Sequence, residues 1–171
     1  MVSYIGTKNI LAKPITKDEY NIYRGWELPA DENGSDEGFL VEYTDGGQSN
    51  HPDHKGYISW SPKDVFDRAY RETDGMTFGM AIEALKLGKA IARKGWNGKG
   101  MFIFKQIPAE ISLDIIPKLQ SVPQVVKDKM IKCNKSLKYT NQMAIVNADG
   151  RVDSWVASSS DIFAEDWYIV E

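Results

Sequence analysis

Cysteine and histidine are scarce in this chain, whose 171 residues hold one cysteine, Cys133, and two histidines, His51 and His54. A single cysteine excludes an internal disulfide and suits a reducing compartment. The segment His51-Pro-Asp-His54 has metal-like spacing, but a zinc site takes three or four ligands and Cys133 is remote in the sequence. We therefore expect no disulfide, no metal site and no cofactor.

Long apolar runs and a strong positive charge are also absent. The chain has no run of about 18 apolar residues, which argues against a membrane-spanning helix. Its N-terminal segment lacks the charged-then-apolar pattern of a signal peptide. The pI of about 5.5 is unlike that of proteins that bind long nucleic acid. We expect a globular protein that stays in the compartment where it is made.

The charge that is present is unevenly distributed. Residues 1–73 carry 8 Lys/Arg against 13 Asp/Glu, whereas residues 74–171 carry 13 against 11. Within residues 74–105 the basic side chains outnumber the acidic ones six to two. They are Lys86, Lys89, Arg93, Lys94, Lys99 and Lys105. A small anion would be attracted to this segment.

Turn residues predict two modules, 1–73 and 74–171, with a seam at Glu72–Met76, where one helical pattern ends and another begins after Asp-Gly. The first reads as a small α+β module. Its expected elements are a strand at Ser3–Ile5, a helix begun by the capping box of Thr16 and Glu19, strands at Phe39–Tyr43 and Tyr57–Trp60, and a helix capped by Ser61 with Pro62 at its first position. Val65, Phe66, Ala69 and Tyr70 should form the inward face of that last helix.

The second module reads as a helix packed on a curved antiparallel sheet. Thr77 should cap the helix, which ends at Gly88. The expected strands are Ala90–Lys94, Met101–Ile107, Gln142–Asn147, Arg151–Ala157 and Trp167–Val170. Between them, a loop-rich insert from Pro108 to Lys138 should contain a helix that starts at a capping box of Ser121 and Gln124, with Val126 and Met130 inward.

The turn from Gly95 to Gly100 contains a combination of residues typical of nucleotide pockets. Trp96 offers a face on which a base can stack, and Asn97 offers an amide that can bind its edge. Gly98 and Lys99 offer backbone N–H groups and a cation for phosphate. The turn lacks the spacing and the Lys-Ser/Thr end of a Walker loop, so ATP hydrolysis is not predicted. The alternative is a tight turn whose tryptophan packs back onto the sheet.

A distant segment offers complementary groups. Trp155 could form a second aromatic wall, while Ser158 and Asp161 could bind ribose hydroxyls or a base amine. Asn141 carries an amide suited to adenine. The alternatives are that the serines satisfy a turn, that Asn141 caps a strand edge, and that Trp167 is mainly core.

Five short motifs together resemble the Thoeris anti-defence 2 family of bacteriophage proteins, over residues 76–171. They are Met76–Lys89, Arg93–Phe102, Asn141–Ala144, Trp155–Asp161 and Ala164–Ile169. The resemblance implies a non-enzymatic sponge that binds, without cleaving, the cyclic ADP-ribose isomers made by bacterial TIR-domain proteins, chiefly 1″–3′ glycocyclic ADP-ribose. Effector activation is thereby prevented.

The same resemblance implies further properties. Some members also take up the cyclic dinucleotides of CBASS systems, such as cGAMP, in a second set of pockets, and the family assembles as homotetramers with pockets between protomers. Carried over by motif, the residues of the ADP-ribose pocket are Trp96, Asn97, Asn141, Trp155, Ser158 and Asp161. Gly98 and Lys99 are assigned to cyclic-dinucleotide phosphate. The protein would act in the cytoplasm of the infected bacterial host.

Two other functions remain open from the residues alone. One is a metal-assisted nucleotide hydrolase that uses Asp161, Glu165 and Asp166 as a carboxylate cluster. The other is a phage module that blocks a host protein through its acidic residues 1–73, which resemble a separate phage-encoded module. A complete catalytic set is not evident in the sequence, which favours the sponge.

Overall fold

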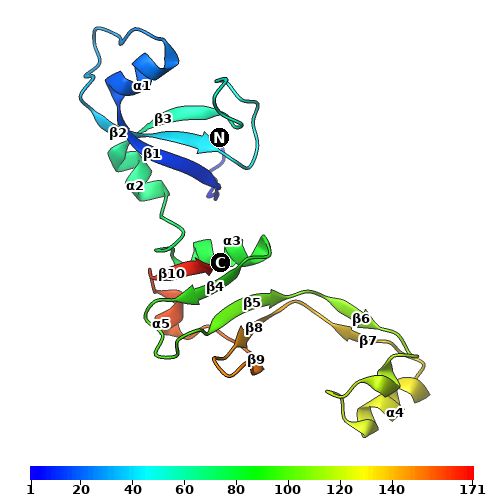
Figure 1. The fold of residues 1–171 in the computed structure, drawn as a ribbon. Helices are drawn as coiled ribbons and strands as arrows, with labels where there is room; N and C mark the ends of the chain where they lie inside the picture. The colour runs from blue at the N-terminus through cyan, green and yellow to red at the C-terminus, as the bar shows by residue number, and fades with distance from the viewer. The chain divides into compact units, whose positions relative to one another are not determined.

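The computed structural model describes residues 1–171, which form two compact units, Met1–Glu72 and Thr73–Glu171. Five α-helices and ten strands in antiparallel sheets confirm the predicted α+β class (Figure 1). No helix in the structure has both the length and the apolar character needed to span a bilayer.

The first unit is built on a three-stranded antiparallel sheet of β1 (Ile10–Thr16), β2 (Glu37–Tyr43) and β3 (Ile58–Pro62), with β2 in the centre. Helix α1 (Lys17–Arg24) follows β1 directly, and its predicted capping box is confirmed. The backbone N–H of Thr16 donates to Glu19 Oε2 over 2.8 Å, and that of Glu19 donates to Thr16 Oγ1 over 3.3 Å. Gly25 ends the helix in the left-handed conformation, at φ 68°.

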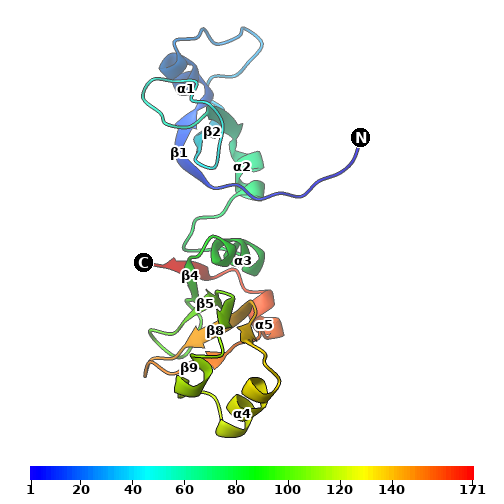
Figure 2. The ribbon, with the colours of Figure 1, turned by 90° about the vertical axis from the view of Figure 1, so that its right-hand side faces the viewer.

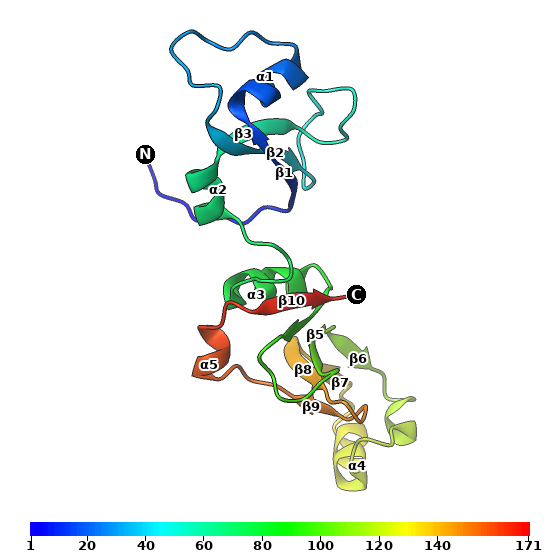
Figure 3. The same cartoon turned by 60° about the vertical axis from the view of Figure 1, so that its left-hand side comes forward.

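The core of this unit lies between the sheet and α1, where Tyr20, Leu40 and Ile58 are buried (Figure 3). The predicted strand at Ser3–Ile5 is wrong, because the first strand begins at Ile10 and pairs along its whole length with β2. Three residues alone do not indicate whether a partner strand lies beside them. The position of the first strand is set by its hydrogen bonds to β2.

Helix α2 (Lys63–Ala69) differs from its prediction in two ways. Pro62 occupies the N-cap position and no side chain caps the helix, so Ser61 does not play the predicted role. No residue of α2 is buried, and the side chain of Val65 is 44% exposed. The helix instead contacts the sheet through Phe66, whose ring stacks on that of Phe39 with the centroids 3.9 Å apart.

The second unit contains a five-stranded antiparallel sheet in the order β10-β4-β5-β8-β9. The strands are β4 (Ala90–Arg93), β5 (Phe102–Gln106), β8 (Gln142–Val146), β9 (Val152–Ser154) and β10 (Trp167–Val170). Helix α3 (Phe78–Lys86) lies beside β4 and β10 (Figure 2), and Thr77 caps it as predicted, accepting from the N–H of Met80 over 3.4 Å. Its buried face packs on Ile91, Ile103 and Trp167 to form the core.

An arm extends from β5 and β8 beyond this sheet (Figure 1). It consists of β6 (Ala109–Ile111) paired with β7 (Leu137–Tyr139), the 3-10 turn η1 (Ile116–Lys118), and helix α4 (Gln124–Lys132). The predicted capping box is wrong, because Pro123 is the N-cap and no side chain caps α4. The predicted inward face is wrong at Val126, which is 38% exposed, whereas Met130 is half-buried.

We expect Ile103→Ala to lower the free energy of unfolding of the second unit by about 2–5 kcal/mol, because the side chain is fully buried and its removal leaves a cavity. Urea denaturation followed by far-UV circular dichroism measures this. Val152→Ala, on the exposed edge strand β9, is the matched control and should shift stability by less than about 0.5 kcal/mol. Equal effects for the two variants would contradict the assignment of the core.

Candidate functional site

Three tryptophans from distant parts of the chain meet against the core of the second unit. Trp96 follows β4, Trp155 follows β9, and Trp167 begins β10. The ring centroids lie 6.2 Å apart for Trp96 and Trp155, 5.5 Å for Trp96 and Trp167, and 6.1 Å for Trp155 and Trp167, all edge-to-face. Trp167 is fully buried, whereas the other two are half-buried. Trp167 therefore forms the base of the cluster, and Trp96 and Trp155 retain exposed ring surface.

Asp161 connects the tryptophan cluster to the short helix α5 (Ser159–Ile162). Its Oδ1 accepts from Trp96 Nε1 over 3.1 Å and from Arg93 Nη1 over 2.8 Å. Its Oδ2 accepts from the backbone N–H of Ser158 over 3.0 Å and from Ser158 Oγ over 2.6 Å, which makes the pair a capping box. The residue is only 8% exposed. Both carboxylate oxygens are thus occupied by protein groups.

Arg93 is the residue that sequence reasoning missed. Its Nε donates to Asp166 Oδ1 over 2.8 Å, while its Nη1 also reaches the carbonyl of Ser160 over 3.2 Å. Asp166 Oδ2 accepts the N–H of Gly95 over 2.7 Å, so the guanidinium and the turn share one carboxylate. In the sequence Arg93 was one of six basic residues near the turn. Its acidic partners lie 68 and 73 positions away, which no local pattern reveals.

The electrostatics of this cluster keep all its charges in place at neutral pH. Burial raises the pKa of Asp161, but hydrogen bonds from Ser158, Arg93 and Trp96 outweigh burial and bring the pKa down to about 2. The pKa of Asp166 is also lowered, since bonds from Arg93 and Gly95 outweigh its burial. Asp166 in turn raises the pKa of Arg93.

The other predicted site residues lie around this cluster. Asn97 and Lys99 are exposed in the turn after Trp96. Gly98 packs on Met101, and a Cβ at this position would come 2.6 Å from Met101 Cε. The amides of Gly95 and Trp96 are already used, by Asp166 and by the carbonyl of Arg93 over 3.4 Å. An incoming anion would therefore meet the turn beyond Trp96.

Asn141 is exposed just before β8, two residues ahead of Met143, whose carbonyl accepts the N–H of Trp155 over 2.9 Å. The structure thus joins Trp96, Ser158 and Asp161 by hydrogen bonds, with Trp155 in contact through its ring. Asn97, Gly98, Lys99 and Asn141 belong to adjoining segments and make no hydrogen bond to Asp161.

The carboxylates and the His54 imidazole bond to protein groups. No group of three or more His, Cys, Asp and Glu side chains is placed to hold a metal ion. Asp161 and Asp166 are bridged by the guanidinium of Arg93, and His54 bonds to Glu42 Oε2 over 2.7 Å and to the Tyr23 hydroxyl over 2.9 Å.

Comparison with known proteins identifies the second unit. Residues 76–170 match the sequence model of a family described as the Thoeris anti-defense 2-like domain. The chain belongs to this family. A protein of Bacillus phage SP01 named Thoeris anti-defense 2 is 35% identical over 95 residues, which are 56% of this chain and 94% of that protein. The predicted family is confirmed, and the Thoeris anti-defense 2-like region contains every residue of the tryptophan and Arg93 cluster.

We expect Arg93→Ala to lower the free energy of unfolding by about 3 kcal/mol, because it leaves Asp161 and Asp166 without their cation. Chemical denaturation measures this loss. Arg151→Ala is the matched control: its ion pair with Asp153 is exposed, so it should cost less than about 1 kcal/mol. An Arg93 variant as stable as the Arg151 variant would show that the network contributes little.

The low pKa of Asp161 predicts a specific acid sensitivity. A carboxyl group whose pKa is lower in the folded state stabilises the protein above its ordinary pKa of 3.8, and this stabilisation is lost as the pH falls toward about 2. Asp161→Asn should therefore be less stable than the wild type at neutral pH, and the difference should shrink in acid. The urea midpoints of Asp161→Asn and the wild type are compared at about pH 7 and at about pH 2.5. A difference between the two proteins that is the same at both pH values would contradict stabilisation by an ionised Asp161.

Proposed function

We propose that this phage anti-defence protein binds and sequesters a cyclic nucleotide immune signal, chiefly 1″–3′ glycocyclic ADP-ribose, without cleaving it. It acts inside the infected bacterial host and prevents activation of the Thoeris effector. Membership of the Thoeris anti-defense 2-like family supports the anti-defence role. The observation that carries the sequestering mechanism is the pair of half-buried tryptophans, Trp96 and Trp155, held by Asp161 and by fully buried Trp167.

Energetics indicate what the tryptophans can contribute. Stacking of a base on an aromatic side chain provides about 1–3 kcal/mol, so two rings provide about 2–6 kcal/mol. A nanomolar complex requires about −12 kcal/mol. The remainder must come from polar contacts and enclosure, for which Asn97 and Asn141 are exposed nearby. We propose that a homotetramer supplies the enclosure, with each pocket completed by a neighbouring protomer.

Asp161 and Ser158 are assigned a positioning role within this proposal. Both oxygens of the Asp161 carboxylate bond to the protein, and Ser158 Oγ bonds to Asp161 and lies 2.8 Å from Ser160 Oγ. Direct contact with the ligand would require one of these bonds to be exchanged. By holding the Trp96 indole N–H, Asp161 fixes the plane of that ring before the ligand arrives, which reduces the entropy lost on binding.

A second ligand class follows from the same turn. Gly98 and Lys99 lie beyond Trp96, and Lys99 is exposed with its ammonium free to meet phosphate. We propose that this part of the turn binds the phosphates of cyclic dinucleotides such as cGAMP, the signals of CBASS systems. A second set of pockets would allow both classes to be held by one assembly.

Sequestration without cleavage is favoured over hydrolysis by the state of the carboxylates. Hydrolysis would need a protonated acid, a free general base or a metal ion. With a pKa of about 2, Asp161 is ionised at neutral pH and bound to Arg93. Asp166 has a lowered pKa and the same cation. Two of the three carboxylates of the proposed hydrolytic cluster are therefore bound to Arg93 and are not free to act as an acid or a base.

Trp96→Ala and Trp155→Ala should each weaken binding of 1″–3′ glycocyclic ADP-ribose about 5- to 150-fold, the equivalent of one lost stack. Isothermal titration calorimetry measures the affinity. In a parallel assay the wild-type protein should deplete the nucleotide from solution and return it intact after heat denaturation.

The matched control is Trp26→Ala, an exposed tryptophan of the first unit, which should leave nucleotide binding unchanged. The depletion assay is repeated with Mg²⁺ or Mn²⁺ added. A new product that accumulates with time would contradict sequestration without cleavage and indicate a hydrolase. Wild-type affinity in both Trp96→Ala and Trp155→Ala would show that the two tryptophans do not bind the nucleotide.

A further inference from the structure

The first unit contains two adjoining hollows that share Lys17 and Trp60, of about 520 and 420 Å³. We refer to them together as the Trp60 groove. The first hollow is lined by Lys17, Asp36, Glu37, Trp60, Pro62, Lys63, Asp64 and Asp67. The second is lined by Lys17, Tyr20, Asn21, Trp26, Glu27, Pro29, Glu32 and Trp60. None of the residues predicted to bind nucleotide lies in the groove.

The aromatic floor of the groove is fixed in position. Trp60 lies directly against Gly38, where a Cβ would come 2.5 Å from the indole ring, so only glycine permits this packing. The indole N–H donates to the carbonyl of Ile15 over 3.3 Å. In the second hollow Tyr20 and Trp26 meet edge-to-face, with their centroids 6.3 Å apart. These rings form a preformed surface rather than mobile side chains.

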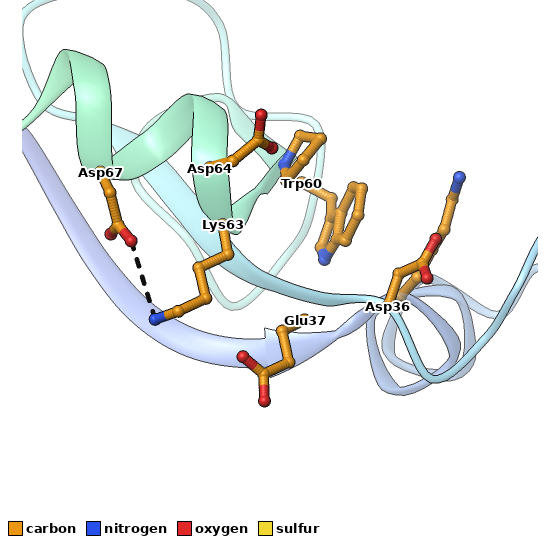
Figure 4. A pocket seen from close by; sticks show the side chains of 8 residues that line it. Asp36, Glu37, Trp60, Lys63, Asp64 and Asp67 are labelled. Carbon is orange, nitrogen blue, oxygen red and sulfur yellow. Dashed lines mark ion pairs between the residues drawn. The ribbon is translucent and has the colours of Figure 1, made fainter.

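The rim of the groove is acidic. Six carboxylates and two lysines line the two hollows. Figure 4 shows Trp60 between Lys63 and Asp64 of α2 on one side and Asp36 on the other. Lys63 pairs with Asp67, their charged atoms 3.7 Å apart, and Arg68 pairs with Asp64 over 3.3 Å, whereas Glu37 has no charged partner. The excess of negative charge would attract a cation and repel a nucleotide.

The aromatic floor already accepts cations from its own chain. Lys17 Nζ lies 5.2 Å from the centroid of the Trp60 ring and 2.7 Å from Glu32 Oε2. Arg24 lies over Trp26, with its Cζ 4.3 Å from the ring centroid. Lys17 therefore lies above an indole and beside a carboxylate, and Arg24 lies above a second indole.

We propose that the Trp60 groove docks an extended, basic peptide segment of a partner protein. Lysine or arginine side chains of the peptide would lie over the aromatic floor, pair with Glu37, and replace the exposed Arg68 as the partner of Asp64 at the rim. Two hollows in series across one shared tryptophan suit a chain that crosses both, more than a compact ligand. Charge complementarity selects a basic partner. This binding is separate from nucleotide sequestration and uses the other unit.

The test uses the full chain and a fluorescein-labelled hexapeptide with lysine at alternate positions, followed by fluorescence anisotropy. The probe should bind saturably at one site, and a peptide with glutamine in place of lysine should bind at least about tenfold more weakly. The affinity should fall severalfold between about 50 and about 300 mM salt, because exposed charges are screened. Spermine competing as strongly as the peptide would overturn the peptide assignment.

Variants locate the site. The substitutions Glu37→Lys and Asp64→Lys should each lower the affinity for the lysine peptide at least about threefold. Asp53→Lys is the matched control, since it makes the same charge change at a side chain that is 73% exposed and outside the groove. Equal weakening by Asp53→Lys would show attraction to net charge alone and overturn the proposal. Circular dichroism and thermal unfolding verify that each variant folds.

Two further measurements separate this proposal from the proposed function. The groove variants should keep full affinity for 1″–3′ glycocyclic ADP-ribose, and Trp96→Ala should keep full affinity for the lysine peptide. Loss of peptide binding in Trp96→Ala would place the peptide at the nucleotide site and overturn the groove.

Discussion

The ion pairs of Arg93 with Asp161 and Asp166 are the interaction on which the organisation of the second unit depends. A single planar guanidinium binds two carboxylates that belong to different segments, and its position at the end of β4 fixes both relative to the sheet. Through Asp166 it sets the path of the turn at Gly95, and through Asp161 it sets the start of α5. Removing charged groups from water costs free energy, and ion pairs and hydrogen bonds offset this cost only when each charged group has a partner. Here both carboxylates accept hydrogen bonds from Arg93 and from a second group.

This constraint separates the roles of the residues at the site. The charged groups bond to one another, while Trp96 and Trp155 beside them are half-buried and the residues around them, such as Asn97, are exposed and polar. Trp167 contributes its indole N–H to the carbonyl of Asp161 over 3.0 Å and is fully buried, so it anchors the cluster without being available to a ligand. Trp96 and Trp155 present the ring faces that remain. In the function that we propose, fixed charges behind half-buried rings would suit recognition by shape and stacking.

Local signals in the sequence predicted what is decided locally. The capping residues Thr16 and Thr77 and the α+β class were predicted correctly, because a cap depends on residues three positions apart. The first strand and the burial of α2 were predicted wrongly, because they depend on which distant segment supplies a partner. The cap of α4 was wrong for a local reason, since the helix begins after Pro123, two residues beyond the predicted cap at Ser121. At the candidate site, the residue types were recognised from their chemistry. Arg93 was not, because its role exists only once β4, α5 and β10 are assembled.

The positions of the Arg93 and Trp96 partners late in the sequence determine when their contacts can form during synthesis. Arg93 and Trp96 are synthesised well before their partners Asp161 and Asp166, and β10 then pairs with β4 across most of the unit. Closing the chain between Arg93 and its partners, 68 and 73 residues away, loses conformational entropy before the ion pairs form, which slows folding. Because translation proceeds at about 5–20 residues per second, the Trp96 turn waits for several seconds with its charged and aromatic groups unmatched. The hydrogen bonds of Arg93 and Trp96 can form only after Asp161, Asp166 and β10 have been synthesised.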